Sequence, residues 1–539
     1  MSGSITLENR FGVNKMELIS LKYAIFVIVL LVLYYCFPKK YRWYVLLAGS
    51  KAYYVIICKW YVLFIIFTIC TTYGSTIWID KLLKEQNAIV KSHKEDWDRQ
   101  TRKEYKEKGR KKRVAVMLFA LLCNFGILAF LKYIPYAGEL GLLLPLGISF
   151  YTFQSMGYVM DVYREIVEPE KNFLKVALFV SFFPQIIQGP IAIYDKLAGQ
   201  LYEGHSLRLE NLQKGALLVL WGVMKKLVIA DRAVNIINFV MDKPMDFSGT
   251  YVFFAAVVYA LQLYADFSGG IDIVRGIAEM FGITMSTNFN HPYFSRSLTE
   301  YWHRWHMTLG DWCRNYIFYP LSISKRFLNF GKWLKPRFGA HISKVLPGCI
   351  ASVITFIVIG VWHGANMKYL YFGLWNGIVI MLAELFAPVN KKVAGGFFKL
   401  TGLREKGIFA TIVSVLWTFM LILVGYYFDI AANASTAFHM LFKSVTDFHI
   451  SELGINNIIL NLGACGLDEY DILLLIICTL LWFFISFVEE NKKLDMRDFI
   501  LSRKLPLRWA IIYLGIFIVI IFGYYGPGVN PADFVYMQF

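Results

Sequence analysis

Histidines that directly follow a tryptophan stand out at two places in a chain with only nine histidines. One place is the run from Trp302 to His306, which ends in Trp305-His306, and the other is Trp362-His363 at the end of an apolar run. Ionisable groups inside a membrane are costly and commonly mark function, and histidine suits proton transfer near neutral pH. The pairs therefore indicate proton-transfer chemistry. The alternatives for each histidine are a structural hydrogen bond between helices, or a metal or haem ligand.

The spacing within 300–316 predicts one helix with an apolar stripe and a neighbouring polar face. His303 and His306 fall on the polar face, and Asp311 is spaced to pair with Arg314. The stripe consists of Trp302, Trp305, Leu309, Trp312 and Tyr316.

Glycine and proline interrupt three apolar stretches beside polar residues. The interruptions are Pro145-Leu-Gly147, the segment 184–190, and Gly269-Gly270. Non-helical backbone at membrane depth is tolerated only where it is buried in protein or lines a wet cavity. The pattern therefore favours a polar cavity, with packing kinks as the alternative. The polar residues beside the interruptions include Gln185, Gln188, Tyr264, Asp266 and Ser268.

The elements that position these residues are membrane helices. The 539 residues are 57% hydrophobic and 17% charged, with a mean hydropathy of +0.50, whereas soluble domains have about 45–50% apolar and 25% charged residues. The chain is therefore predicted to be an all-α, multi-pass membrane protein with roughly 11–14 membrane helices, some of them broken or re-entrant. The clear candidate spans are 18–37, 42–58, 60–80, 114–134, 141–160, 173–191, 213–231, 250–268, 346–364, 366–388, 407–428, 469–488 and 509–527.

The net charge of +17 is interpreted as basic cytoplasmic loops rather than nucleic-acid binding. The largest loop, 81–113, has 13 Lys and Arg against 6 Asp and Glu and is predicted to be helical. Counting spans between basic loops places the N-terminus and the C-terminal tail outside a plasma membrane. The basic loops are expected to bind anionic lipid headgroups. A docking surface for a coenzyme A phosphate or an acidic carrier protein is the sharper alternative.

Four parts are predicted along the chain. The segment 1–113 contains N-terminal membrane helices and a basic cytoplasmic segment, and 114–390 is the catalytic core. More membrane helices follow over 391–527, and 528–539 is an extracellular aromatic tail. The eight cysteines include no C-x-x-C pair, and no metal or bound cofactor is expected.

Several strings together resemble the membrane-bound O-acyltransferase (MBOAT) family, in the bacterial branch that includes alginate O-acetylation and teichoic acid D-alanyl transfer membrane proteins. The likeness covers about 144–377 in order and spacing. The strings are Leu144 to Gln154, Asp161 to Arg164, Phe182 to Ile191, Gly222 to Arg232, Tyr264 to Gly269, Tyr301 to His306 and Val361 to Gly364.

The resemblance implies a funnel-shaped helical domain with a tunnel, and it assigns the family's two functional histidines to His306 and His363. Arg is usual in the family where this chain has His303, and His is frequent where it has Asn376. The residues expected to line or support the tunnel are Trp302, Trp305, Arg304, Asp311, Arg314, Trp362, Asn366, Gln185, Gln188, Tyr264, Asp266 and Ser268.

The C-terminal string Phe534 to Phe539 resembles a short aromatic tail of several acetylating members, in which the tyrosine is an acyl relay. Tyr536 takes that place here, and Met537 replaces the middle aromatic. An interfacial aromatic anchor is the alternative.

Acyl transfer, most simply of an acetyl group, is therefore expected, from a cytoplasmic thioester toward hydroxyls of a cell-surface polysaccharide. His363 would be the general base, His306 would orient or polarise the reacting groups, and Tyr536 or a sugar would supply the hydroxyl. A separate extracellular acyltransferase is expected to carry the group onward. D-Alanyl transfer to teichoic acid is an alternative, and so is a non-enzymatic glycan or lipid transporter.

Overall fold

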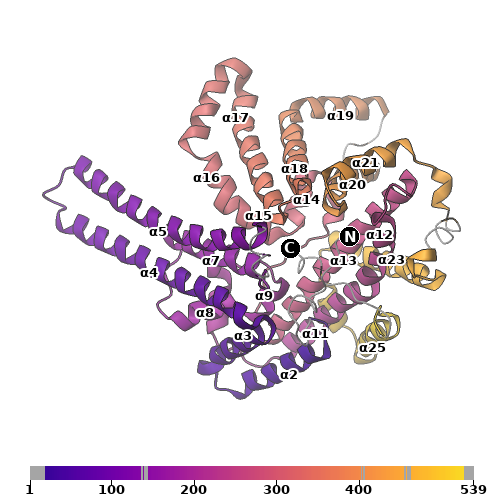
Figure 1. Ribbon diagram of the computed structural model, residues 1–539, viewed down its shortest axis with the longest axis horizontal. Coiled ribbons are helices and arrows are strands. Elements are labelled where there is room, and N and C mark those ends of the chain that lie inside the picture. Colours follow the sequence, from indigo (N-terminus) through magenta and orange to yellow (C-terminus); the bar gives the residue numbers. More distant parts are fainter. Residues whose placement is uncertain are drawn as a thin grey trace. The chain divides into compact units, whose positions relative to one another are not determined.

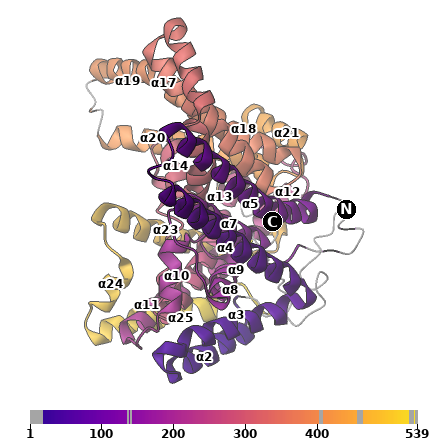
Figure 2. The ribbon, with the colours of Figure 1, turned by 90° about the vertical axis from the view of Figure 1, so that its left-hand side faces the viewer.

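The computed structural model describes residues 18–134, 138, 142, 144–401, 404, 407–454, 457, 463–526 and 534. Of residues 397, 398 and 464, the backbone alone is described. Within these ranges every regular element is a helix, as Figures 1 and 2 show. This confirms the all-α prediction.

The chain divides into two compact units. Unit 1 comprises 1–219 and 271–286, and unit 2 comprises 220–270 and 287–539. The helices α11 (Leu209–Met224) and α13 (Gly249–Met280) have residues in both.

Unit 1 contains a long antiparallel pair of helices, α4 and α5 (Figure 1). The turn between them ends at Asp98, whose carboxylate accepts the backbone N–H of Thr101, as expected of a helix N-cap. Arg113 donates to Gln86 across the pair at 2.8 Å. The prediction of helix over 81–113 is confirmed except at 93–98, which form the turn between α4 and α5. The helices of unit 1 are α2 (Leu21–Cys36), α3 (Arg42–Cys58), α4 (Val62–Ser92), α5 (Arg99–Tyr133), α7 (Ile148–Tyr163), α8 (Phe173–Ser181), α9 (Phe183–Gln188) and α10 (Tyr194–Tyr202).

Two of the three predicted interruptions are real, and both lie in unit 1. The third, at Gly269-Gly270, is wrong, because both glycines lie inside the continuous helix α13. Gly147 caps α7 in the left-handed region with φ of 71°, and a Cβ there would lie 2.2 Å from the Ile186 carbonyl oxygen. Helix α8 ends at Ser181, and α9 begins at Phe183 with Pro184 in its first turn. The predicted span 173–191 is therefore two short helices.

Unit 2 contains α17, which is broken at Gly339 with φ of 78° and packs beside α18 (Figure 1). A π-helical segment, η3 (Lys225–Ala230), links α11 to α12. The other helices of unit 2 are α12 (Asp231–Met241), α14 (Leu298–Arg304), α15 (Met307–Cys313), η5 (Arg314–Phe318), α16 (Tyr319–Ser322), α17 (Lys325–His363), α18 (Met367–Leu385), α19 (Ala387–Thr401), α20 (Ile408–Ile430), α21 (Ala434–Thr446), α23 (Glu469–Lys492), α24 (Met496–Leu501) and α25 (Leu505–Phe522).

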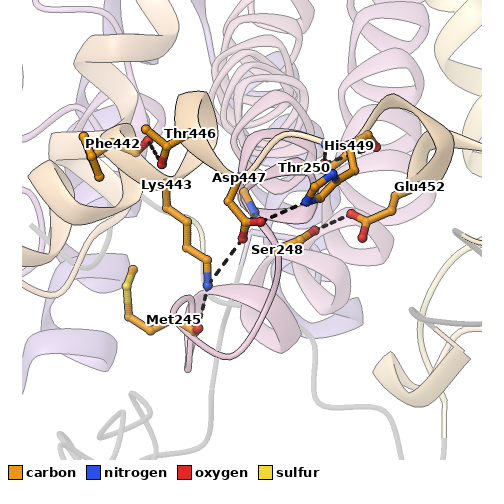
Figure 3. Close-up of polar contacts among 10 residues, drawn as sticks. Met245, Ser248, Thr250, Phe442, Lys443, Thr446, Asp447, His449 and Glu452 are labelled. Carbon is orange, nitrogen blue, oxygen red and sulfur yellow. Dashed lines mark hydrogen bonds and ion pairs between the residues drawn. The ribbon is translucent and has the colours of Figure 1, made fainter.

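A polar cluster on unit 2 fixes the start of α13 (Figure 3). The Asp447 carboxylate accepts the backbone N–H of Gly249 at 3.2 Å and pairs with the His449 ring at 3.0 Å. Lys443, on α21, donates to the Met245 carbonyl oxygen at 2.7 Å. The hydrogen bond from the His449 ring and that from the Gly249 N–H lower the pKa of Asp447. The carboxylate therefore caps the helix in its ionised form.

Among the described residues, seven helical stretches are long and apolar enough to span a membrane. An eighth is formed if the bent pair α18 and α19 counts as one span. The chain is thus a multi-pass membrane protein. The predicted spans 18–37 and 173–191 lie in shorter apolar helices. The seven stretches are Lys39–Ser92, Arg99–Tyr133, Gly249–Met280, Lys325–His363, Ile408–Ile430, Glu469–Lys492 and Leu505–Phe522.

The single helix predicted over 300–316 is wrong, because the chain breaks between α14 and α15. His306 adopts a left-handed conformation with φ of 43°. The backbone N–H of Met307 donates to the Asn288 carbonyl oxygen at 2.9 Å instead of to a carbonyl one turn earlier. Trp305 and His306 are therefore presented by a turn rather than by a helix face.

Candidate active site

His306 and His363 line one pocket within unit 2. Its lining comes from α13, α14, α15, α17, α18 and α20. Most of the lining is apolar or aromatic, as in typical small-molecule sites. The lining residues are Leu263, Tyr301, Trp302, Trp305, His306, Leu309, His363, Phe372, Asn376, Ile422, Tyr426 and Asp429.

The tautomer of His306 follows from its neighbours. The Oδ1 atom of Asn288 accepts the backbone N–H of Thr308 at 3.1 Å, which identifies this atom as the amide oxygen. The same oxygen lies 3.1 Å from His306 Nδ1. An amide oxygen only accepts, so Nδ1 carries the proton in the neutral ring and Nε2 carries the lone pair. His306 is 2% exposed, so Asn288 orients a buried imidazole whose Nε2 is the basic nitrogen.

His363 is the last residue of α17, and close packing of α17 on α18 fixes its position. A Cβ at Gly360 would lie 2.2 Å from the Tyr369 carbonyl oxygen, and one at Gly373 would lie 2.3 Å from that of Phe356. Only glycine allows this approach. His363 is 8% exposed and packs against the Trp362 ring, with centroids 5.0 Å apart.

Trp362 contacts both histidine rings, and Trp302 bonds to a residue of the pocket lining. The Trp362 ring also contacts the His306 ring, with centroids 6.3 Å apart. Trp302 donates its indole N–H to Asn376 Oδ1 at 3.0 Å. Asn376 stands where the resemblance led us to expect histidine, and it lines the pocket. Its bond to Trp302 joins α14 to α18.

Trp305 is buried and packs against Tyr264, with ring centroids 5.9 Å apart. His303 is exposed and is not among the pocket-lining residues, whereas His306 is buried, so the two histidines that the helical pattern placed on one face have different environments.

Asp266 and Ser268 belong to a second polar cluster in unit 2 rather than to the pocket lining. Lys226 Nζ lies 2.7 Å from Asp266 Oδ1 and 2.8 Å from Asp231 Oδ1, and all three side chains are buried. Lys225 donates to Ser268 Oγ at 2.8 Å. We call these five residues, with the adjacent ion pair Arg232–Asp471 at 2.8 Å, the lysine network.

Other predicted site residues make structural contacts. Arg304 pairs with Glu300 at 2.7 Å and with Glu490 at 3.0 Å. Asp311 pairs with Arg314 as the spacing predicted. Asn366 caps α18 by accepting the backbone N–H of Lys368.

Gln185 and Gln188 lie in unit 1, where Gln185 donates to the side chain of Gln154 and to the carbonyl oxygen of Pro190. Neither glutamine is among the residues that line the pocket. Tyr536 lies outside the described residues.

Three groups of functional interest were missed from the sequence. Asn288 lies 18 residues before His306, in a stretch that shows only an interrupted apolar pattern. Asp429 lines the pocket and accepts the Tyr259 hydroxyl at 2.7 Å. Tyr426 joins Tyr301 at 2.8 Å and Tyr293 at 3.1 Å. A carboxylate at the end of an apolar run was a usable signal for Asp429, whereas tyrosines in apolar runs are too common to be one.

In the part of the chain that the structure describes, no group of three or more His, Cys, Asp or Glu side chains is spaced to hold a metal ion.

Comparison with known proteins gives a consistent family. Residues 169–335 match the sequence model of MBOAT, the membrane-bound O-acyltransferase family. A protein named "Probable alginate O-acetylase AlgI" from Pseudomonas syringae pv. tomato is 30% identical over 315 residues, which are 58% of this chain and 54% of that protein.

Two further relatives have other printed names. The "Peptidoglycan O-acetyltransferase" of Helicobacter pylori is 30% identical over 51% of this chain and 56% of its own length. The "Teichoic acid D-alanyltransferase" of Bacillus subtilis is 26% identical over 52% of this chain and 67% of its own length. The chain thus spans little more than half the length of the acetylating relatives.

Proposed function

We propose that the chain, whose residues 169–335 match the MBOAT family model, is a membrane O-acyltransferase. It moves an acyl group, most simply acetyl, from a cytoplasmic thioester toward hydroxyls of a cell-surface polysaccharide. The observation that carries the proposal is the pocket lined by both His306 and His363. The names of the acetylating relatives support the choice of acetyl.

The proposed reaction is a thioester-to-ester exchange. His363 takes the proton of the acceptor hydroxyl as its oxygen attacks the thioester carbonyl carbon. The new C–O bond forms, the C–S bond breaks, and the thiolate leaves with the proton that His363 then returns. A base placed in this way contributes roughly 10²–10⁴-fold to the rate. The exchange is nearly balanced in free energy, so it needs no ATP.

His306 has the supporting role. Since its Nδ1–H is held by Asn288, its Nε2 accepts a hydrogen bond from an N–H or O–H group of a reactant. This bond orients that reactant in the pocket. A fixed ring costs no reorganisation during the reaction. The aromatic lining around both histidines excludes water, which protects the thioester from hydrolysis.

The acceptor hydroxyl in this proposal is Tyr536, which forms an acyl-tyrosine and passes the acyl group outward. A sugar hydroxyl that reacts directly is the other route. The proposed orientation places both termini outside and the basic segment 81–113 at the cytoplasmic face, following the positive-inside rule. There it meets membrane lipids and the donor, either acetyl-coenzyme A or an acidic acyl carrier protein. A separate extracellular acyltransferase then receives the group.

A second candidate is D-alanyl transfer to teichoic acid, which the name of the Bacillus subtilis relative supports. The two candidates differ only in the acyl group and its acceptor, so one chemical analysis separates them.

The experiment is the analysis of acids and amino acids released by mild base from cell walls and exopolysaccharide, with and without the gene. We expect acetate to fall on deletion and to return with the wild-type chain. Loss of D-alanine instead would select the second candidate, and unchanged esters would favour a transporter over an acyltransferase. Labelling with a radioactive donor tests the relay, because label that persists undiminished in Tyr536→Phe contradicts it.

A further inference from the structure

The end of α25 and the chain that follows it contact the π-helical segment η3 and the start of α12, all within unit 2. The backbone N–H of Tyr524 donates to the Leu227 carbonyl oxygen at 2.9 Å. Arg232, one residue beyond Asp231 at the start of α12, donates to the Phe522 carbonyl oxygen at 3.1 Å. The Arg232 guanidinium also lies 5.6 Å from the centroid of the Tyr524 ring.

The π-helical geometry suits η3 to this role. A π turn is rare, widens the helix and frequently occurs at functional sites. In η3 the Leu227 carbonyl oxygen accepts a bond from outside its own helix. The same turn places Lys225 and Lys226 in the lysine network, where both are buried. One short segment therefore carries both the buried cations and the backbone contact to the C-terminal chain.

Phe534 makes the last described contact of the chain with η3. Its ring centroid lies 4.5 Å from Lys226 Nζ, and the side chain is only 5% exposed. An ammonium within about 6 Å of a ring centroid is attracted to the ring face, most strongly where water is excluded. Asp231 and Asp266 hold the same ammonium at 2.8 and 2.7 Å. The cation is thus fixed by two carboxylates while Phe534 covers it.

We propose that η3 is the docking site for the C-terminal segment of this chain, with the Lys226–Phe534 contact as its final fixed point. This deepens the proposed function, on which its catalytic part rests. Tyr536 follows Phe534 by two residues in the sequence. Phe534 is then a positioning residue for the acyl-carrying tyrosine. The lysine network acts as an anchor and takes no part in the chemistry.

The docking is tested by hydrogen–deuterium exchange of the C-terminal peptides of the full-length protein in detergent. Phe534→Leu keeps an apolar side chain but removes the ring face. Phe534→Tyr keeps the ring. Phe517→Leu is the matched control, because Phe517 lies on α25 and is 55% exposed. Lys226 is left intact, since its removal would break two buried ion pairs.

We expect exchange in the C-terminal peptide to be roughly tenfold or more faster in Phe534→Leu, given the usual strength of a desolvated cation–π contact. Phe534→Tyr and Phe517→Leu should match the wild type. Wild-type exchange in Phe534→Leu overturns the docking, whether or not the protein transfers acyl groups.

The positioning role is tested on the same variants by acyl transfer from a radioactive acetyl thioester. Phe534→Leu should lose at least about tenfold in rate, and Phe534→Tyr should restore most of it. Faster exchange together with a normal transfer rate in Phe534→Leu overturns the positioning role, because the tail would then be displaced without effect on the reaction.

Discussion

The histidine pocket and the lysine network are two buried polar clusters in the same unit, and they differ in the charge of the groups that are paired in them. In the lysine network, three cations accompany three carboxylates: Lys225, Lys226 and Arg232 with Asp231, Asp266 and Asp471. In the pocket, the partners of His306 and Trp302 are neutral amides. Buried charges persist only where they are paired.

The difference separates a site that holds the fold from a site that reacts. An ion network with matched charges gains nothing by releasing a proton. A neutral imidazole oriented by an amide accepts a proton without breaking an ion pair first. The comparison therefore places the chemistry at the pocket and the anchoring function at the network.

The largest expected effect on stability comes from breaking the network. Lys226→Met leaves two buried carboxylates without their cation, and removing one partner of a buried pair typically costs about 3–5 kcal/mol. We expect a large fall in the thermal unfolding temperature in detergent. Lys214→Met is the matched control, since Lys214 forms an i,i+4 pair with Glu210, which is largely exposed, and such pairs contribute about 0.3–0.5 kcal/mol. Equal effects of the two variants on the unfolding temperature would refute the claim that the lysine network stabilises the fold.

A smaller effect is expected from Asn288→Ala, which tests the orientation of His306. The change leaves buried donors of Thr308 and His306 without their shared acceptor, at about 1–3 kcal/mol. We expect the acyl-transfer rate to fall roughly 10–100-fold. Asn290→Ala provides the control, because Asn290 is exposed and bonds through its backbone. A normal rate in Asn288→Ala would show that the ring needs no such support.

Trp302→Phe should have a weaker effect still. The change keeps an aromatic ring but removes the bond to Asn376, which is worth about 1 kcal/mol. We expect the transfer rate to fall by less than about tenfold, with unfolding nearly unchanged. A loss as large as that of a histidine variant would assign Asn376 a direct part in the reaction.

The smallest effect is expected at the exposed cluster of Figure 3. The pKa of Asp447 is lowered in the folded protein, so its contribution to stability is present above the unfolded pKa of about 3.9. That contribution disappears as the pH falls through the lowered folded value. Asp447→Asn should slightly reduce the unfolding temperature at pH 7, and the difference from wild type should vanish in strong acid. A difference that persists there would contradict the ionised cap.

The sequence predicted those features that depend on local patterns. Composition indicated the helical membrane fold, the charged segment 81–113 indicated its helices, and the Gly and Pro residues located the breaks near Gly147 and Pro184. The paired tryptophans and histidines indicated the pocket. Each of these signals lies within a few residues of the feature that it predicts.

The remaining features depend on contacts between distant parts of the chain. The break at Trp305 and His306 exists because Asn288 takes the Met307 N–H, and no helical pattern reveals such an acceptor. Asp266 was expected near the tunnel, whereas its partner is Lys226, 40 residues earlier. The contact of Phe534 with Lys226 joins residues about 300 positions apart, a kind of pairing that only packing decides.

The most direct test of the account is single-turnover acyl transfer by the purified protein in liposomes, with a radioactive acetyl thioester on the cytoplasmic side. His363→Ala and His306→Ala are compared with His303→Ala, whose histidine is exposed only three residues from His306. We predict a loss of roughly 10²–10⁴-fold for His363→Ala, a clear loss for His306→Ala, and a wild-type rate for His303→Ala, with all three variants folded. Wild-type transfer by folded His363→Ala would contradict the assignment of the chemistry to this pocket.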